Sequence, residues 1–280
     1  MDKAKELFAA GKLSEAIEEL VREVKANPND GATRTFLFEL SCLAGDWERA
    51  ERQLDVIGHQ STQAGLGVMV YRANINAERE RKRVFAEGVQ PHFLREPPPY
   101  IDLHVEALKQ LSKGQMTDAR ATLDRAEEER PAIAGKIDGK EFKDFRDYDD
   151  FVAPVLELIV KDKYVWLPLE HIKSVQLSPP RQLRDMIWAS AHVEASDGTI
   201  GEVFMPTLYA GTSSATDDQV RLGRMTDWRE LGENLYWGLG LRLFLVDGED
   251  KTLFEATPVE FNVTEPKGEP AELRPNIAPD

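Results

Sequence analysis

The side chains that could do chemistry in this sequence lack the spacing that chemistry needs. No two of its histidines lie three or four residues apart, the spacing that places two metal ligands on one helix face. No Gly-x-Ser-x-Gly turn, which would present a serine nucleophile, occurs in the chain. The single cysteine, Cys42, can form neither an internal disulfide nor a thiolate zinc site, and we interpret it as a packing residue. We therefore expect no metal, no cofactor and no catalytic residue. The histidines are His59, His92, His104, His171 and His192.

The densest group of carboxylates, in residues 138–150, does not match a calcium loop. An EF-hand loop starting at Asp147 would need an oxygen ligand at its fifth position and glycine at its sixth, where Phe151 and Val152 stand. Aromatic residues recur there every three positions, and this predicts a short amphipathic segment that docks a helical part of the chain onto a sheet. These residues are Phe142, Phe145, Tyr148 and Phe151.

Two glycine pairs, in 238–240 and 65–67, lack the further glycine and helix of a dinucleotide site or the full phosphate-loop pattern. One enzymatic alternative stays open, in which a deep pocket of a β-rich domain gathers a mixed set of polar side chains. That set is His171, Tyr209, Arg224 and Asp227.

A basic run at Arg79–Arg83 could indicate phosphate binding. However, Glu78, Glu80 and Glu87 alternate with the run at helical spacing, and such charges pair on a solvated helix face. We therefore predict a solvent-exposed ion-pair face.

An internal repeat organises the first half of the chain. Segments 11–20, 45–54 and 114–123 share a glycine, a large apolar residue two positions later, alanine five later and leucine nine later. The first two copies are 34 residues apart, the period of tetratricopeptide (TPR) units. Glycine permits a tight turn, and alanine lets two helices approach closely. An irregular helical bundle is the alternative.

The first helices of these units are expected at residues 3–10, 32–44 and 100–112, with another long helix near 62–85. From about residue 141 the hydrophobic period changes toward two, which indicates strands. We expect strands at 155–160, 164–167, 172–177, 186–194, 199–205, 235–246 and 253–261, with a loop carrying a short strand at 217–228. The strands predict an antiparallel sheet or partly closed barrel.

The expected fold class is therefore α+β and multidomain. We predict a TPR-like helical domain at residues 1–134, a small and mostly antiparallel β-rich domain at 135–262, and a disordered proline-rich tail at 263–280. Of the net charge of −15, −4 lies in residues 1–134 and −11 in 135–280. This charge disfavours nucleic acid as a partner. Short apolar runs and the absence of a signal-peptide pattern favour a cytoplasmic protein without membrane contact.

Several motifs in the second half fall in a family-specific order. They are Phe145-Arg-Asp-Tyr-Asp-Asp-Phe151, Tyr164-Val-Trp-Leu-Pro-Leu-Glu-His-Ile172, Pro180-Arg-Gln-Leu-Arg-Asp-Met-Ile-Trp188, Gly201-Glu-Val-Phe-Met-Pro-Thr-Leu-Tyr209, Gly223-Arg-Met-Thr-Asp-Trp228 and Gly240-Leu-Arg-Leu-Phe-Leu-Val246. With these motifs the chain resembles, over residues 1–262, the ImpE family, also called TagJ or SciE-type virulence proteins.

The resemblance implies a non-enzymatic accessory protein of bacterial type VI secretion. It implies binding to the small subunit of the contractile sheath through that subunit's amino-terminal helix, and an influence on the ATPase that disassembles the sheath. A general TPR-type adaptor unrelated to secretion is the alternative. Helical repeats offer a concave surface and sheets offer edges or pockets, and the sequence does not choose between them.

The resemblance supplies no catalytic or ligand residues to carry over. The candidates for partner binding are Tyr209, Arg224, Asp227 and Trp228. A tryptophan of this set could equally be a core residue, like Trp166, Trp188 and Trp237.

Overall fold

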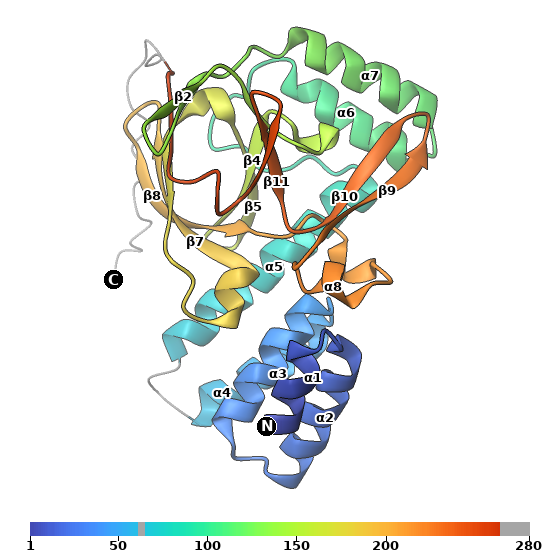
Figure 1. Ribbon diagram of the computed structural model, residues 1–280, viewed down its shortest axis with the longest axis vertical. Helices are drawn as coiled ribbons and strands as arrows, with labels where there is room; N and C mark the ends of the chain where they lie inside the picture. The colour runs from blue at the N-terminus through green and yellow to red at the C-terminus, as the bar shows by residue number, and fades with distance from the viewer. Residues whose placement is uncertain (61–64, 264–280) are drawn as a thin grey trace, which may run out of the picture.

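A computed structural model describes residues 1–60 and 65–263, and helices occupy its first half (Figure 1). The predicted long helix begins at Gly65 in the structure, and its expected start at residue 62 lies outside the described residues. The helices are α1 (Asp2–Ala9), α2 (Leu13–Ala26), α3 (Gly31–Leu43), α4 (Trp47–Gln60), α5 (Gly65–Glu87), α6 (Ile101–Ser112) and α7 (Met116–Glu129).

The repeated sequence frame forms three antiparallel helix pairs, α1–α2, α3–α4 and α6–α7. The glycine of each copy lies at the turn with a positive φ, between 70° and 77°, which only glycine adopts without cost. The alanines and leucines of the frame are buried, so they form the seam between paired helices. The alanines are Ala16, Ala50 and Ala119, and the leucines are Leu20, Leu54 and Leu123.

The second half of the chain forms antiparallel sheets, as predicted. The largest has eight strands in the order β2-β1-β13-β6-β7-β8-β4-β5, and a three-stranded sheet has the order β12-β11-β3. A two-stranded ribbon, β9–β10, stands apart from both (Figure 1). The strands are β1 (Gly135–Ile137), β2 (Lys140–Phe142), β3 (Phe145–Asp147), β4 (Val155–Val160), β5 (Lys163–Pro168), β6 (Ile172–Leu177), β7 (Trp188–Ala195), β8 (Ile200–Pro206), β9 (Thr226–Gly232), β10 (Leu235–Gly240), β11 (Leu243–Val246), β12 (Glu249–Thr252) and β13 (Val259–Phe261).

Three predictions in the last third of the chain were wrong in detail. The expected strand 235–246 is two strands, because the chain leaves the ribbon at Gly240, with φ +88°, before β11 begins. Segment 217–228 contains a short helix, α8 (Asp218–Arg221), before β9. Of the expected strand 253–261 only β13 is extended, and β12 was not predicted. The expected disorder beyond residue 263 lies outside the described residues.

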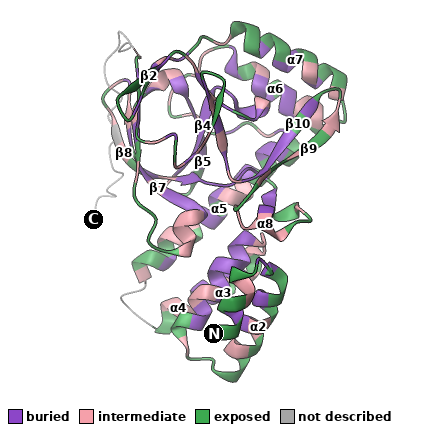
Figure 2. Cartoon of the chain, in the orientation of Figure 1, coloured by how far each residue is buried: buried purple, intermediate pink, exposed green. Residues whose placement is uncertain are grey.

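Two apolar clusters form the core, and Figure 2 shows buried residues in both the helical and the sheet half. One lies between the sheets. The other is continuous from α1 through α5 to β10, so the helical half and the sheet half share buried side chains. Helix α5 crosses from the helix pairs to the sheet, where it packs on β5 (Figure 1). No helix within the described ranges is long and apolar enough to cross a membrane.

The segment with recurring aromatic residues is divided among three short elements. It forms β2, β3 and a short 3-10 helix, η2 (Asp150–Val152). Phe142 and Phe145 are buried between the sheets, and Tyr148 is exposed. The segment does contact the helical half, because the Arg120 guanidinium of α7 pairs with the Asp150 carboxylate at 2.8 Å.

Candidate functional site

The structure brings two of the four predicted partner-binding residues together. The rings of Tyr209 and Trp228 lie 5.6 Å apart. Tyr209 is buried, and its hydroxyl donates to the Asp147 carboxylate at 3.0 Å. Asp227 is exposed, and its carboxylate accepts from the Trp228 backbone N–H. Trp228 is therefore the member of this pair that a partner can reach.

Arg224 lies elsewhere and has a structural contact. Its guanidinium donates to the carbonyl oxygens of Phe8 and Ala9, at 2.8 and 3.1 Å, and lies over the Phe8 ring. Carbonyls at a helix end have no partner within the helix, so Arg224 satisfies the end of α1. Nearby, the Asp218 carboxylate accepts from the Leu13 N–H at 2.8 Å. Segment 211–224 thus joins the sheet half to the first helix pair.

The set proposed for an enzyme does not form one site. His171 ends a 3-10 turn before β6, where Arg95 and Asp197 are the charged groups that influence its imidazole. Arg224 bonds α1, and Tyr209 is covered by its neighbours. These side chains therefore have separate surroundings.

A buried network of charges, which was not predicted from the sequence, lies beneath Tyr209. The Glu157 carboxylate of β4 accepts from the Arg81 Nε of α5 at 2.7 Å and from Arg242 Nη2. Arg242 Nη1 also pairs with the Asp147 carboxylate at 2.5 Å, and all four side chains are buried. Arg81 further donates to the Leu208 carbonyl at 2.8 Å. The network therefore ties α5 to both sheets.

The carboxyl groups of this region differ in acidity. Burial alone would raise the pKa of Glu157, but Arg242 and Arg81 outweigh it and lower the pKa to about 2. Burial raises the pKa of Asp147 to about 6 and that of Asp149 to about 7. Glu157 thus stays ionised between the two arginines.

A carboxyl with a pKa near neutrality can serve as a catalytic acid or base. The Asp149 oxygens, however, accept from the backbone N–H groups of Phe151 and Gly238, both at 2.9 Å, and the side chain is buried. No substrate reaches it in this arrangement. Asp149 therefore positions η2 against β10.

The prediction of a solvated basic run was wrong for Arg81. Arg83 does form the expected exposed pair with Glu87, whereas Arg79 pairs with Glu51 of α4 and Arg81 points into the core. The sequence did contain an indication of a buried ion pair, because Glu157 interrupts the otherwise apolar strand β4. A charge within such a run needs a buried partner, and the sequence does not say which arginine provides it.

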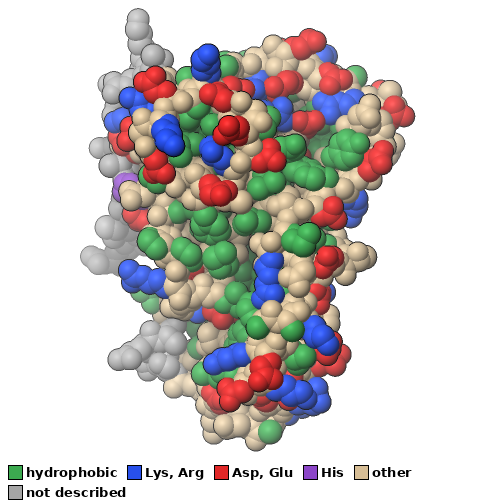
Figure 3. Space-filling model, in the orientation of Figure 1, with side chains coloured by type: hydrophobic (Ala, Val, Ile, Leu, Met, Phe, Trp, Pro, Cys, Tyr) green, Lys and Arg blue, Asp and Glu red, His purple; other side chains and the backbone are tan. Residues whose placement is uncertain are grey.

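A groove of about 590 Å³ lies between the two halves of the molecule. We call it the α5 groove, because α5 provides much of its lining. Figure 3 shows hydrophobic side chains continuing from the sheet half to the helical half across one face of the molecule. The lining residues are Gly45, Trp47, Glu78, Arg81, Lys82, Phe85, Ala86, Leu111, Ser112, Ala210, Gly211, Ser213, Ser214, Arg229, Leu231 and Trp237.

The α5 groove combines an apolar lining with free cations. The rings of Phe85 and Trp237 lie 5.3 Å apart, and the Trp237 Nε1 donates to the Ala210 carbonyl at 2.8 Å, which fixes the indole. Lys82 and Arg229 are exposed, and neither has an ion-pair partner within the described ranges. An occupant with an apolar face and acidic flanks fits this lining.

The described part of the chain contains no group of three or more His, Cys, Asp or Glu residues that could hold a metal ion. What the geometry provides is an apolar and cationic groove beside a rigid buried network. Such a site can bind a polypeptide segment.

Comparisons with known proteins give the chain a family. The family profile described as ImpE protein matches residues 139–260. The type VI secretion system accessory component TagJ of Pseudomonas aeruginosa PAO1 is 34% identical over 262 residues, which cover 94% of this chain and 92% of that protein. The crystal structure of protein VPA1032 from Vibrio parahaemolyticus superposes with a TM-score of 0.85 at 25% identity, covering 92% of this chain and 97% of that one.

These matches confirm the resemblance seen in the sequence motifs. The match to TagJ includes the helix pairs as well as the sheets, because it covers nearly the whole of both proteins. The chain belongs to the ImpE family and is a homologue of the type VI secretion system accessory component TagJ.

Proposed function

We propose that this protein is a non-enzymatic accessory component of type VI secretion that binds the amino-terminal helix of the small sheath subunit in the α5 groove. The observation that carries the proposal is the groove itself, with aromatic side chains in its lining and the unpaired Lys82 and Arg229 beside them. Helix-in-groove recognition uses an apolar stripe on the helix against such a lining. The name of the similar Pseudomonas protein supports the secretion context.

The three helix pairs act in this proposal as TPR-like units, of which α3–α4 and α6–α7 contribute to the groove lining. Gly45 and Trp47, at the turn and start of α4, line the groove together with residues of β9 and β10. The division into a helical domain at 1–134 and a β-rich domain at 135–262 stays part of the proposal. Binding at the groove would connect this protein to the sheath, and through the sheath to the disassembly ATPase.

The test is a calorimetric titration of the purified protein with a peptide of the cognate subunit's amino-terminal helix. We expect saturable binding with a Kd of about tens of micromolar or tighter, the range for a single amphipathic helix. Because the free cations favour acidic flanks on the helix, Lys82→Glu with Arg229→Glu should weaken binding about tenfold or more.

The matched control reverses two exposed charges outside the groove, Lys5→Glu and Arg181→Glu, and should leave the Kd unchanged. An absence of saturable binding contradicts the proposed partner. Equal binding by both double variants contradicts the proposed groove but not the partner.

A further inference from the structure

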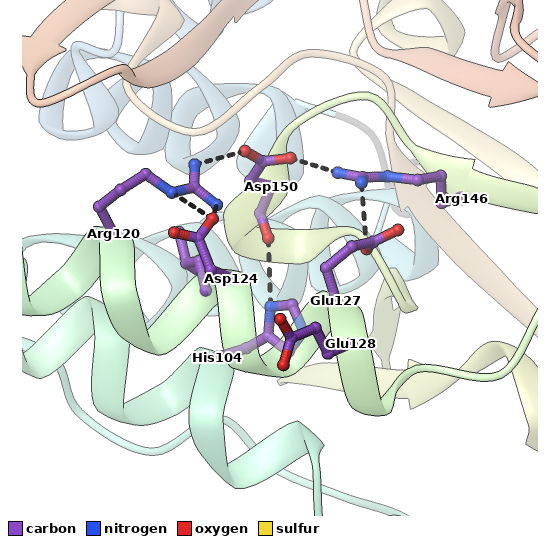
Figure 4. A pocket seen from close by; sticks show the side chains of 8 residues that line it. His104, Arg120, Asp124, Glu127, Glu128, Arg146 and Asp150 are labelled. Carbon is purple, nitrogen blue, oxygen red and sulfur yellow. Dashed lines mark hydrogen bonds and ion pairs between the residues drawn. The ribbon is translucent and has the colours of Figure 1, made fainter.

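Two neighbouring surface hollows outside the α5 groove share the side chain of Asp150. One has a volume of about 350 Å³ and is lined by Tyr148, Asp150, Trp228 and Tyr236. The other has about 500 Å³ and lies between α6, α7 and η2 (Figure 4); its lining is His104, Arg120, Leu123, Asp124, Glu127, Glu128, Arg146 and Asp150. We call the two hollows together the aromatic–acidic surface.

Two aromatic side chains of the first hollow are partly exposed to solvent instead of being buried in the core. Tyr148 is 38% exposed and Tyr236 46% exposed. Trp228 is held between the rings of Tyr148, at 4.8 Å, and Tyr209, at 5.6 Å. Figure 3 shows hydrophobic side chains over the ribbon β9–β10, with acidic side chains around them. The Trp228 ring is therefore held in place by its neighbours before anything binds.

Unpaired carboxylates lie in the second hollow and in the β9–β10 ribbon. Asp150 is itself neutralised, because the guanidinium groups of Arg120 and Arg146 both bind it (Figure 4). Glu128, in the second hollow, has no ion-pair partner in the described part of the chain. The same holds for Glu230, which lies opposite Tyr236 in the β9–β10 ribbon. The surface thus has negative charge available for a cation.

His104 provides a separate indication that the second hollow lacks a hydrogen-bond donor. Its Nδ1 lies 3.1 Å from the Asp150 carbonyl oxygen, which can only accept, so Nδ1 carries the hydrogen. Its Nε2 is then an acceptor, and this atom is buried without a partner within the described residues. The imidazole is 2% exposed and lines the second hollow. What this side of the surface lacks is an N–H donor.

We propose that the aromatic–acidic surface binds an arginine-containing segment of a protein partner. A guanidinium group is planar, carries five N–H donors and stacks on aromatic faces, so one arginine fits the Trp228 and Tyr236 rings. A second basic side chain would lie near Glu128. The strong negative charge of residues 135–280 speeds the approach of such a segment.

The test is calorimetry of the full chain with the peptide acetyl-Gly-Arg-Gly-Arg-Gly-amide. The comparison peptide replaces both arginines by citrulline, which keeps the shape and removes the charge. We expect the arginine peptide to bind at least about tenfold more tightly. Equal binding of the two peptides would overturn the proposal.

Variants separate this surface from general attraction to an acidic protein. Tyr236→Ala and Tyr148→Ala should each weaken binding of the arginine peptide about fivefold. Tyr236→Phe, which keeps the ring, should leave the binding unchanged. Glu249→Gln removes an exposed carboxylate elsewhere and should have no effect. Unchanged melting temperatures show that the exposed-ring variants fold. The proposal would be overturned if Tyr236→Ala left binding of the arginine peptide unchanged, or if Glu249→Gln weakened it equally. It would also be overturned if spermidine bound as tightly as the arginine peptide and its binding were as sensitive to Tyr236→Ala.

Discussion

At the scale of single residues, the buried charges between α5 and the sheets hold the two halves together. Glu157 binds both Arg81 and Arg242, and the Tyr164 hydroxyl donates to it at 2.5 Å. Removal of one member leaves another charged and buried without compensation. Such a change costs more than the intact pair contributes.

We therefore predict that Arg81→Met destabilises the protein by about 3–5 kcal/mol. The matched control is Arg83→Met, two residues away, which breaks an exposed pair and should cost less than about 0.5 kcal/mol. Urea denaturation of both variants measures the difference. Equal losses would show that the buried network does not support the fold.

His104 gives the stability a pH dependence. Burial, with a contribution from Arg146, lowers the pKa of its imidazole from 6.5 to about 4. The unfolded chain takes up this proton first, so the stabilisation is present above pH 6.5 and is lost as the pH falls toward 4. The charged groups around it are Arg120, Asp124, Glu127, Glu128, Arg146 and Asp150.

Between pH 7 and pH 4.5 the wild type should lose about 2–3 kcal/mol more stability than His104→Gln, whose amide can still donate to the Asp150 carbonyl. Other titrating groups are common to both proteins and cancel in the comparison. Urea midpoints at the two pH values provide the measurement. Parallel pH profiles would contradict a neutral buried imidazole.

At the scale of elements, the turns of the helix pairs explain how the halves meet. Gly45 has a φ of +70°, and a Cβ built there would lie 2.5 Å from the Ser213 Oγ. Gly114, in the third copy of the repeat, has a φ of +75° and open space around it. The same sequence feature thus makes a contact in the second copy and none in the third.

Gly114→Ala should lower the free energy of unfolding by about 1–2 kcal/mol, because alanine is strained in a left-handed backbone conformation. Alanine at Gly45 should cost about 1–3 kcal/mol more, because Ser213 must move. Adding Ser213→Gly to Gly45→Ala should recover this excess and leave Gly114→Ala unaffected. Thermal denaturation tests the series, and equal costs at the two glycines would contradict a packed turn.

The elements that follow from local pattern were predicted well. Glycine, alanine and leucine recurring in one frame placed the helix pairs, and alternation placed β4 and β6 at their observed bounds. Contacts between distant segments were not predictable. Arg81 meets Glu157 across 76 residues, and Trp228 meets Tyr148 only because the ribbon folds back. Of the four partner-binding candidates, the sequence could not tell that Arg224 holds α1.

At the scale of the whole molecule, excess acid coexists with a cationic groove. The net charge is −15, yet Lys82 and Arg229 stand free beside the aromatic lining of the α5 groove. The groove lining comes from α5 and from five other segments, which α5 and the buried network hold in position. We propose that a helix of the small sheath subunit binds there.

The most direct measurement uses a fluorescent label in the groove. Cys42 is 3% exposed and burial raises the pKa of its thiol, so a cysteine introduced by Ser112→Cys can be labelled selectively. The control label is at Glu18→Cys, on the exposed face of α2 outside the groove. Titration with the sheath-helix peptide should change the emission of the Ser112 label saturably, with the Kd found by calorimetry, and leave the Glu18 label unchanged. Saturable binding that the Ser112 label does not report would contradict the assignment of the α5 groove.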